Sequence, residues 1–185
     1  MKTLGLMTIG EVGAWVCSHL QKRSIRVVLT GGACVSIYSD NAYLSNDLDF
    51  IEEMSAGPGK LRNALKEIGF EKEGRHYVHP GTVFFLEFPP GPLSIGAEHV
   101  SRVMELELDT GILRLLSPTD CVKDRLAAYY HWDDRQSLHQ ALLVASNQEI
   151  DLLEVRYWSE REGEMDKFER FRQELTKQEK KVPGV

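Results

Sequence analysis

The segment from Leu29 to Ile51 reads LTGGACVSIYSDNAYLSNDLDFI, and it decides the fold that we predict for this chain. The short β-branched and apolar run at residues 25–30 indicates a buried strand that ends at two glycines. Residues 33–38 then predict a short helix, and a polar stretch follows. Charged and apolar residues alternate over residues 47–51, as they do in a strand. The segment therefore predicts strand, glycine turn, helix and second strand.

Two acidic residues, Asp47 and Asp49, lie on the second of these strands. Residues two apart on a strand project from the same face, so both carboxylates point the same way. Close carboxylates repel each other unless they are protonated or neutralised by a cation, and Mg²⁺ prefers a few carboxylates together with substrate phosphates. The pair is a candidate metal site. A solvated polar face at the start of a strand is the alternative.

The glycine pair Gly31-Gly32 follows Thr30 at the junction of the first strand and the short helix. Glycine lets the backbone approach a phosphate closely, and a helix N-terminus presents free N–H groups. This junction is a candidate phosphate-binding loop. A turn that merely needs positive φ is the alternative.

A third acid, Glu87, stands alone in the apolar run from Val83 to Phe88. Burying an unpaired charge is costly, so the position suggests a metal ligand. An edge-strand carboxylate is the alternative. Taken together, the glycines and the three acids predict a phosphate cradle beside a metal site.

The rest of the chain divides into a mixed part and a helical part. Thr8 and Glu11 fit a capping box that starts a helix over residues 9–23. The pattern further predicts a helix at 60–68 and strands at 70–73, 77–78, 82–88, 103–108 and 112–116, with no regular pairing over the proline-rich residues 89–92. The last two strands flank Asp109-Thr110-Gly111, which predicts a hairpin. From Ser117 onward, helices are predicted over 118–132, 135–146, 151–162 and 164–180. We expect an α+β protein with a core over residues 1–116 and a C-terminal helical region, 117–185, packed on it.

The amino-acid composition indicates a globular protein and argues against several other classes. The 185 residues are 42% hydrophobic and 27% charged, which is ordinary for a globular domain. A formal net charge of -6 argues against a protein whose main task is to coat duplex nucleic acid. Three scattered cysteines show neither zinc spacing nor a disulfide framework, and no apolar run is long enough for a membrane span. We expect a cytoplasmic protein without a membrane partner.

The motifs resemble those of the nucleotidyltransferase superfamily, which has a polymerase-beta-like fold. The resemblance rests on Thr30-Gly31-Gly32, on Asp47-Leu48-Asp49-Phe50 and on Glu87 as third acid. The run from Ser117 to Ala127 is similar to AbiEii-type toxins and related bacterial nucleotidyltransferase-like proteins. The chain departs from these patterns at Ala33, where many superfamily members have Ser, and at Arg125, where the toxins usually have Lys.

This resemblance implies a mixed β-sheet flanked by helices and an Mg²⁺-dependent transfer reaction. Asp47, Asp49 and Glu87 would be catalytic and would hold two Mg²⁺ ions. An NTP would give its NMP to a hydroxyl of an RNA such as a tRNA end, of a protein or of a small molecule, with release of pyrophosphate. A toxin–antitoxin partner is a further implication.

Basic residues of the helix that starts at Pro118 are candidates for nucleotide binding, with Thr30 and the glycines. Val122, Leu126 and Tyr129 form the expected core stripe. Arg125 borders that stripe, whereas Lys123 is expected to point further outward. We therefore favour Arg125 as the phosphate contact, with Lys123 second. An exposed salt bridge within the helix is the alternative for both.

Other features are assigned structural roles. His76 and His79 flank a short strand without zinc spacing, so we expect them on a strand surface. The charged stretch 160–181 predicts a solvated helix face or a homodimer contact. A Rossmann-type dinucleotide site is excluded because no GxGxxG opens a long helix. A non-catalytic protein of the same fold, acting as a protein- or RNA-binding partner, is the alternative function.

Overall fold

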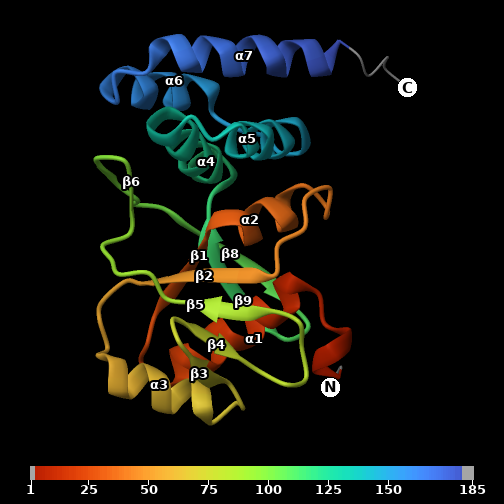
Figure 1. Ribbon diagram of the computed structural model, residues 1–185, viewed down its shortest axis with the longest axis vertical. Helices are drawn as coiled ribbons and strands as arrows, with labels where there is room; N and C mark the ends of the chain where they lie inside the picture. The colour runs from red at the N-terminus through yellow and green to blue at the C-terminus, as the bar shows by residue number, and fades with distance from the viewer. Residues whose placement is uncertain (1–2, 181–185) are drawn as a thin grey trace.

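A computed structural model of the chain describes residues 3–180, and Figure 1 labels its elements. The helical elements are η1 (Leu4–Leu6), α1 (Ile9–Lys22), α2 (Gly31–Tyr38), α3 (Pro58–Lys66), α4 (Pro118–Trp132), α5 (Arg135–Asn147), α6 (Leu152–Arg161) and α7 (Met165–Glu179). The strands are β1 (Val27–Thr30), β2 (Asp47–Glu52), β3 (Glu71–Glu73), β4 (His76–Val78), β5 (Phe85–Glu87), β6 (Ser94–Ile95), β7 (Glu98–His99), β8 (Val103–Leu108) and β9 (Gly111–Leu116).

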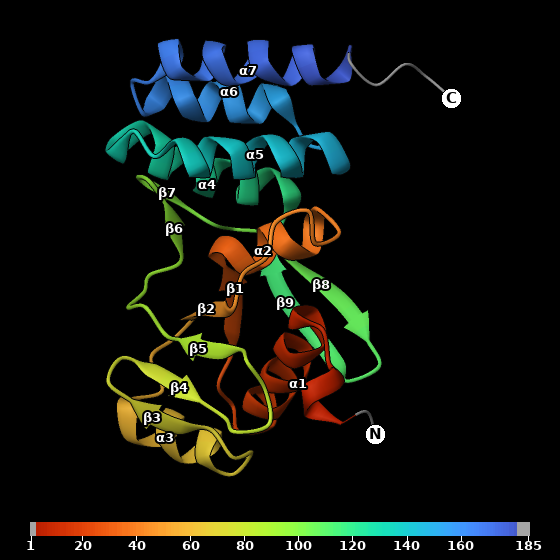
Figure 2. The same ribbon diagram turned by 45° about the vertical axis from the view of Figure 1, so that its right-hand side comes forward.

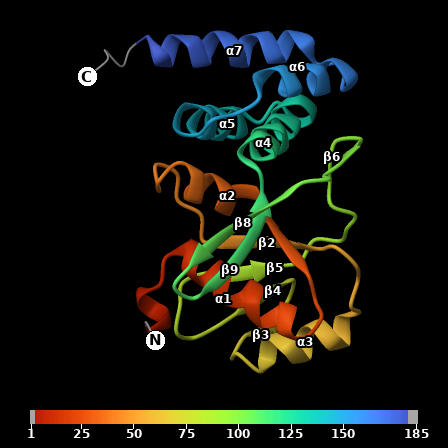
Figure 3. The same ribbon diagram turned by 180° about the vertical axis from the view of Figure 1, so that it is seen from behind.

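The predicted mixed sheet is confirmed. Seven strands pair in the order β3-β4-β5-β2-β1-β9-β8, and the pairs β2/β5 and β1/β9 are parallel while the others are antiparallel. Strands β6 and β7 form a separate small hairpin. Figure 3, seen from behind, shows β8 at the edge of the large sheet. The arrangement is α+β, as expected.

Helices cover the sheet and extend beyond it. A Cβ added at Gly13 of α1 would meet Leu113 at 3.1 Å and Leu48 at 3.3 Å, so α1 packs on the face that these leucines share. Helix α2 contacts β1 and β2, and also α4 and α5. Figure 2 shows α4 to α7 stacked beyond α2, at one end of the molecule. Helix α4 therefore lies between the sheet-containing part and the last helices.

Several local signals are confirmed in detail. Thr8 and Glu11 form the capping box at the start of α1, with Glu11 Oε2 accepting from the Thr8 N–H at 2.7 Å. Helix α4 starts at Pro118 after Ser117, whose hydroxyl accepts from the Asp120 N–H at 3.0 Å. The hairpin of β8 and β9 closes where it was predicted.

Two strand predictions need correction. The strand predicted over residues 82–88 is limited to Phe85–Glu87, because the chain turns just before it, with the Thr82 N–H donating to His79 O at 3.3 Å. The hairpin of β6 and β7 was not predicted, since two-residue strands carry no periodic signal. Residues 89–92 form no strand, as expected.

The division into a core over residues 1–116 and a helical region over 117–185 stays a prediction, and residues 181–185 lie outside the described residues. Within residues 3–180, all strands precede residue 117 and helices α4 to α7 follow it. None of the described helices is long and apolar enough to cross a membrane.

Candidate active site

The three predicted acids lie on two adjacent strands. Along β2, Leu48 and Phe50 are fully buried whereas Asp47 and Asp49 are partly exposed, so both aspartates project from the opposite face. Strand β5 runs parallel to β2 and places Glu87 opposite Asp49. Because β5 lies between β4 and β2, the alternative of Glu87 as an edge-strand carboxylate is wrong. We call Asp47, Asp49 and Glu87 the carboxylate site.

Asp49 is the most strongly perturbed acid of this site. Burial, with the neighbouring charges of Asp47 and Glu87, raises the pKa of Asp49 from 3.8 to about 6. Arg125 of α4 lowers this pKa and Asp124 raises it. Helix α4 therefore faces the carboxylate site, and the negative charge there is only partly offset by Arg125.

Gly31 lies directly against Asp49. Its φ is +68°, and a Cβ at this position would be 2.6 Å from Asp49 Oδ2. Thr30 pairs with Asp49 across β1 and β2, and its hydroxyl donates to Asp49 O at 3.2 Å. The turn at Gly31 therefore needs positive φ, which was the alternative to a phosphate-binding role. It also brings the backbone so close to the Asp49 carboxylate that only glycine fits.

The N-terminus of α2 opens beside these acids. Thr30 is the N-cap residue of α2, but its side chain makes no capping hydrogen bond. A helix N-terminus carries N–H groups without intrahelical partners and the positive end of the helix dipole. The first turn of α2 can therefore accept an anion next to the carboxylate site.

Ser45 is a neighbour that the sequence interpretation missed. Its hydroxyl donates to Asp47 Oδ1 through a short hydrogen bond, and to Asp47 O at 3.3 Å. A Cβ at Gly32 would meet Ser45 Oγ at 3.2 Å and the Tyr43 ring at 3.3 Å. The loop before β2 thus folds back over Gly32 and orients Asp47. The position of Ser45, two residues before Asp47, could have suggested this contact from the sequence, because a serine hydroxyl can hydrogen-bond to a nearby residue of the chain.

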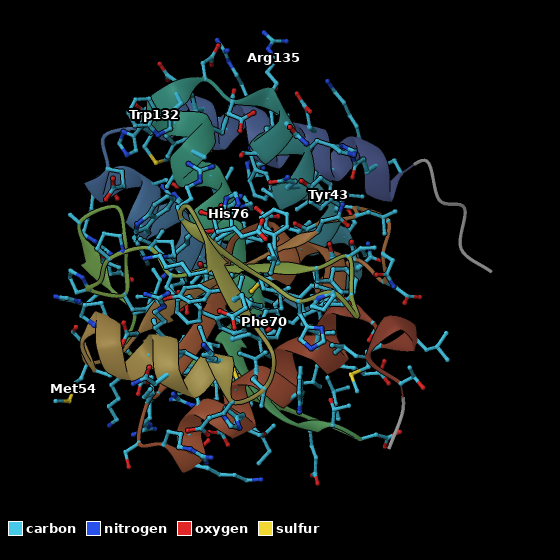
Figure 4. The ribbon with its side chains drawn as sticks, turned by 60° about the horizontal axis from the view of Figure 1, so that its bottom comes forward. Tyr43, Met54, Phe70, His76, Trp132 and Arg135 are labelled. Atoms are coloured by element: carbon cyan, nitrogen blue, oxygen red, sulfur yellow. The ribbon has the colours of Figure 1, made fainter. Side chains whose placement is uncertain are left out.

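Glu87 is bound by His76, which was expected on a strand surface, and by Arg75. Its Oε1 is 2.5 Å from His76 Nε2 and 3.4 Å from Arg75 Nε. His76 is the register partner of Glu87 in β4, and Figure 4 shows it at the end of the β3–β4 hairpin. This contact depends on cross-strand register, so no local pattern around His76 could have revealed it.

Arg125 and Lys123 have different surroundings. The Arg125 guanidinium donates to Asp124 Oδ2, with Nη2 at 2.5 Å, and to Gln140 Oε1 at 3.3 Å. It borders the buried side of α4, as predicted, and it interacts with Asp49. Arg125 is therefore placed to meet an anion at the carboxylate site.

The prediction that Lys123 points outward is wrong. Its side chain is 1% exposed, and Nζ lies 2.5 Å from Glu154, 3.0 Å from Glu98 and 3.2 Å from Asp120. Helix α6 and strand β7 cover this side of α4, which the amphipathic pattern of α4 alone could not show. We call Lys123, Glu98, Asp120 and Glu154 the lysine cluster. A salt bridge within the helix does form between Lys123 and Asp120, but it is buried, whereas the alternative expected an exposed one.

The carboxylate oxygens of this site are suitable ligands for a hard cation, but the three side chains do not point toward one common position. Within residues 3–180, no group of three His, Cys, Asp or Glu side chains has the geometry of a metal site. Glu87 is directed to His76 rather than to Asp49. Yet the raised pKa of Asp49 reflects burial and carboxylates that a cation would neutralise. The residues fit Mg²⁺ if Glu87 turns from His76 toward Asp49.

Comparison with known proteins identifies the fold. No protein-family model and no curated protein matches the sequence. The structure is similar to the crystal structure of an antigenic nucleotidyltransferase-like protein from Paracoccidioides brasiliensis, with a TM-score of 0.56, 15% identity and 74% of each chain covered. The fold is therefore nucleotidyltransferase-like.

Two further structures are those of the antibiotic-resistance factor ANT(2'')-Ia. The solution structure has a TM-score of 0.47 with 12% identity, covering 94% of each chain. The crystal structure in complex with adenylyl-2''-tobramycin has a TM-score of 0.45 with 12% identity, covering 86% of this chain and 94% of that one. Likenesses at this level add nothing to the fold assignment.

Proposed function

We propose that the chain is an Mg²⁺-dependent nucleotidyltransferase that moves an NMP from an NTP to a hydroxyl acceptor. One observation supports the proposal: Asp47, Asp49 and Glu87 lie on the adjacent strands β2 and β5, and Asp49 lies against Gly31 at the start of α2. This arrangement combines a carboxylate cluster with an anion-accepting helix N-terminus, within a nucleotidyltransferase-like fold.

Asp47, Asp49 and Glu87 would hold two Mg²⁺ ions. Bound there, Mg²⁺ would supply charge neutralisation for the triphosphate and would lower the pKa of the acceptor hydroxyl. Ser45 holds the Asp47 carboxylate in place, and the Asp49 backbone is held by Thr30. These contacts pre-orient the two aspartates before substrate binds.

The nucleotide phosphates would bind where the chain offers N–H groups and positive charge. Thr30, Gly31 and Gly32 form the start of α2, and Arg125 of α4 interacts electrostatically with Asp49. Catalysis would then rest mainly on positioning and on charge complementarity. We leave Lys123 out of this role, because its ammonium already has three carboxylate partners.

A non-catalytic partner protein of the same fold is the second candidate. Ala33 replaces the serine that many superfamily members have, and Glu87 is held by His76 and Arg75. The proposed likeness to AbiEii-type toxins would give such a protein, or the enzyme, a bacterial cytoplasmic setting with a toxin–antitoxin partner. A tRNA end or a protein would then be the acceptor to test beside small molecules.

Calorimetry with ATP, GTP, CTP and UTP in the presence of Mg²⁺ tests the proposal. The wild type is expected to bind at least one nucleotide, and Asp47→Asn/Asp49→Asn is expected to lose that binding. Asp109→Asn, in the exposed turn between β8 and β9, is the matched control and should bind like the wild type. Equal or absent binding in all three proteins would favour the non-catalytic partner. Selective binding would justify a search for the acceptor by label transfer.

A further inference from the structure

A cavity of about 560 Å³ lies outside the carboxylate site, beyond the carboxyl ends of the parallel strands β2 and β5. Its walls come from the end of β2, the start of α3, the β3–β4 hairpin and the segment Phe88–Pro92. Figure 1 shows these segments gathered where β2 and β5 both leave the sheet. The volume is in the range that holds a drug-sized small molecule.

One part of the cavity lining is apolar and aromatic, beside charged residues. Tyr77 is buried, and its ring packs edge-on against Phe88 with centroids 5.6 Å apart. Leu61 and the prolines of the Phe88–Pro92 segment complete this part of the lining. Rigid rings and prolines lose little conformational freedom when they cover a ligand, so this surface suits a flat apolar body.

The acids of the cavity wall are already engaged. Glu53 Oε1 accepts from Arg114 Nη2 at 2.8 Å, and its Oε2 lies 3.1 Å from Arg26 Nε. Glu52 Oε2 accepts from the Ala56 N–H at 2.8 Å. Two arginines therefore neutralise Glu53, whereas Glu52 keeps its negative charge and has one oxygen held by a backbone N–H.

The basic residues of the wall are less engaged. None of the ion pairs found within residues 3–180 involves Lys72, whose Nζ lies 5.8 Å from the centre of the Tyr77 ring. The Arg75 side chain is 81% exposed, and its Nε lies 3.4 Å from Glu87 Oε1 and donates to His76 Nε2 at 3.0 Å. The ammonium of Lys72 is thus available at the rim of the cavity, and the exposed guanidinium of Arg75 is shared with Glu87.

We propose that this cavity is a second ligand site, for a small molecule that combines a flat apolar body with a phosphate or carboxylate group. The apolar body lies against Tyr77 and Phe88, and the anionic group binds Lys72 and Arg75.

Arg75 connects this site to the carboxylate site. Its Nε is 3.4 Å from Glu87 Oε1, and it also lines the cavity. An anion that draws Arg75 toward the cavity removes one of the two contacts that hold Glu87, the other being the contact with His76, and so makes it easier for Glu87 to turn toward a metal. This coupling, unlike the binding itself, rests on the proposed nucleotidyltransferase function, and it must be reciprocal between the two ligands.

Binding is tested by NMR on the full ¹⁵N-labelled chain without metal or nucleotide, with phenyl phosphate as the probe. We expect saturable shifts of the amide signals of Lys72 to Tyr77 and around Phe88. Lys72→Gln should weaken binding about tenfold, as expected for a lost charge-assisted hydrogen bond. Lys22→Gln, an exposed lysine at the end of α1, is the matched control and should leave it unchanged.

Two further probes separate the parts of the ligand. Benzylamine keeps the ring but reverses the charge, and inorganic phosphate keeps the charge but lacks the ring; both should bind at least tenfold more weakly. Shifts that do not map to the cavity, or equal affinity of Lys72→Gln, would overturn the site. Equal affinity for inorganic phosphate would overturn the apolar subsite.

Asp47→Asn/Asp49→Asn keeps the failure of this inference distinct from that of the proposed function. This variant should bind phenyl phosphate like the wild type even though it loses the Mg²⁺–nucleotide. In the wild type, saturating phenyl phosphate should tighten Mg²⁺–nucleotide binding several-fold, and Arg75→Gln should abolish that effect. Unchanged nucleotide affinity in the wild type would overturn the coupling.

Discussion

The carboxylate site and the lysine cluster both gather three acids next to helix α4, yet they differ in how the charge is compensated. In the lysine cluster, the ammonium of Lys123 lies within 3.2 Å of three carboxylates. Burial would raise the pKa of Glu98, but hydrogen bonds and charges from Lys123 and Arg161 outweigh it and lower this pKa. The chain itself neutralises this cluster.

In the carboxylate site, Arg125 of α4 interacts both with Asp49 and with its own neighbour Asp124. Arg125 donates to Asp124, and the pKa of Asp49 stays raised by burial and by the other two acids. The comparison teaches that similar acid clusters serve different ends: one is completed within the chain and holds elements together, whereas the other retains negative charge for a cation from outside.

The largest expected effect is on the lysine cluster. Lys123→Met leaves Glu98, Asp120 and Glu154 without their cation, so we expect a loss of about 3–5 kcal/mol in the free energy of unfolding. Urea denaturation measures it, with the exposed Lys22→Met as control. Unchanged stability together with lost nucleotide binding would instead return Lys123 to a nucleotide-binding role.

The next effect concerns the backbone of the carboxylate site. Gly31→Ala forces a Cβ to within 2.6 Å of Asp49 Oδ2 at a φ of +68°. We expect it to lower stability by about 2 kcal/mol and to weaken nucleotide binding. Gly59→Ala, in α3 with nothing within 4 Å of the added Cβ, is the control and should be neutral or slightly stabilising. Equal behaviour of the two variants would contradict the close contact.

A smaller change in stability, this time a gain, is expected for Asp49→Asn. Folding raises the pKa of Asp49 to about 6, so the charged carboxylate costs stability above that pH, and the cost disappears below about pH 4. Asp49→Asn should therefore be more stable than the wild type by about 1–2 kcal/mol at pH 7.5, after allowance for solvent screening, and equal to it at pH 4.

Thermal unfolding at the two pH values measures this difference, with Asp109→Asn as the exposed control. If the wild type is as stable as Asp49→Asn at pH 7.5, or more stable, the charge of Asp49 is already neutralised within the chain, as the charges of the lysine cluster are.

The smallest effect belongs to the exposed part of the lysine cluster. Arg161 forms a short ion pair with Glu98, but its side chain is 59% exposed. We expect Arg161→Gln to cost about 0.5 kcal/mol or less, because exposed ion pairs contribute little. A loss comparable to that of Lys123→Met would show that the cluster acts as one network rather than through its buried lysine.

Much of the secondary structure could be predicted from interactions between residues that are close in the sequence. The capping box of Thr8 and Glu11, the proline start of α4 and the β8–β9 hairpin each depend on neighbours within a few residues. The shared face of Asp47 and Asp49 follows from the two-residue repeat of a strand. The need for glycine at position 31 follows from a tight strand-to-helix turn.

Tertiary structure decided which side chains meet across the fold. His76 meets Glu87 through the β4–β5 register, and Lys123 meets Glu98 and Glu154 from 25 and 31 residues away. The sequence by itself determined most of the elements, the acidic pair and the glycine turn, because backbone geometry and nearest neighbours set them. Only the packing of α6 and the β6–β7 hairpin on α4 decided that Lys123 is buried, since a helix pattern does not show what covers its polar side.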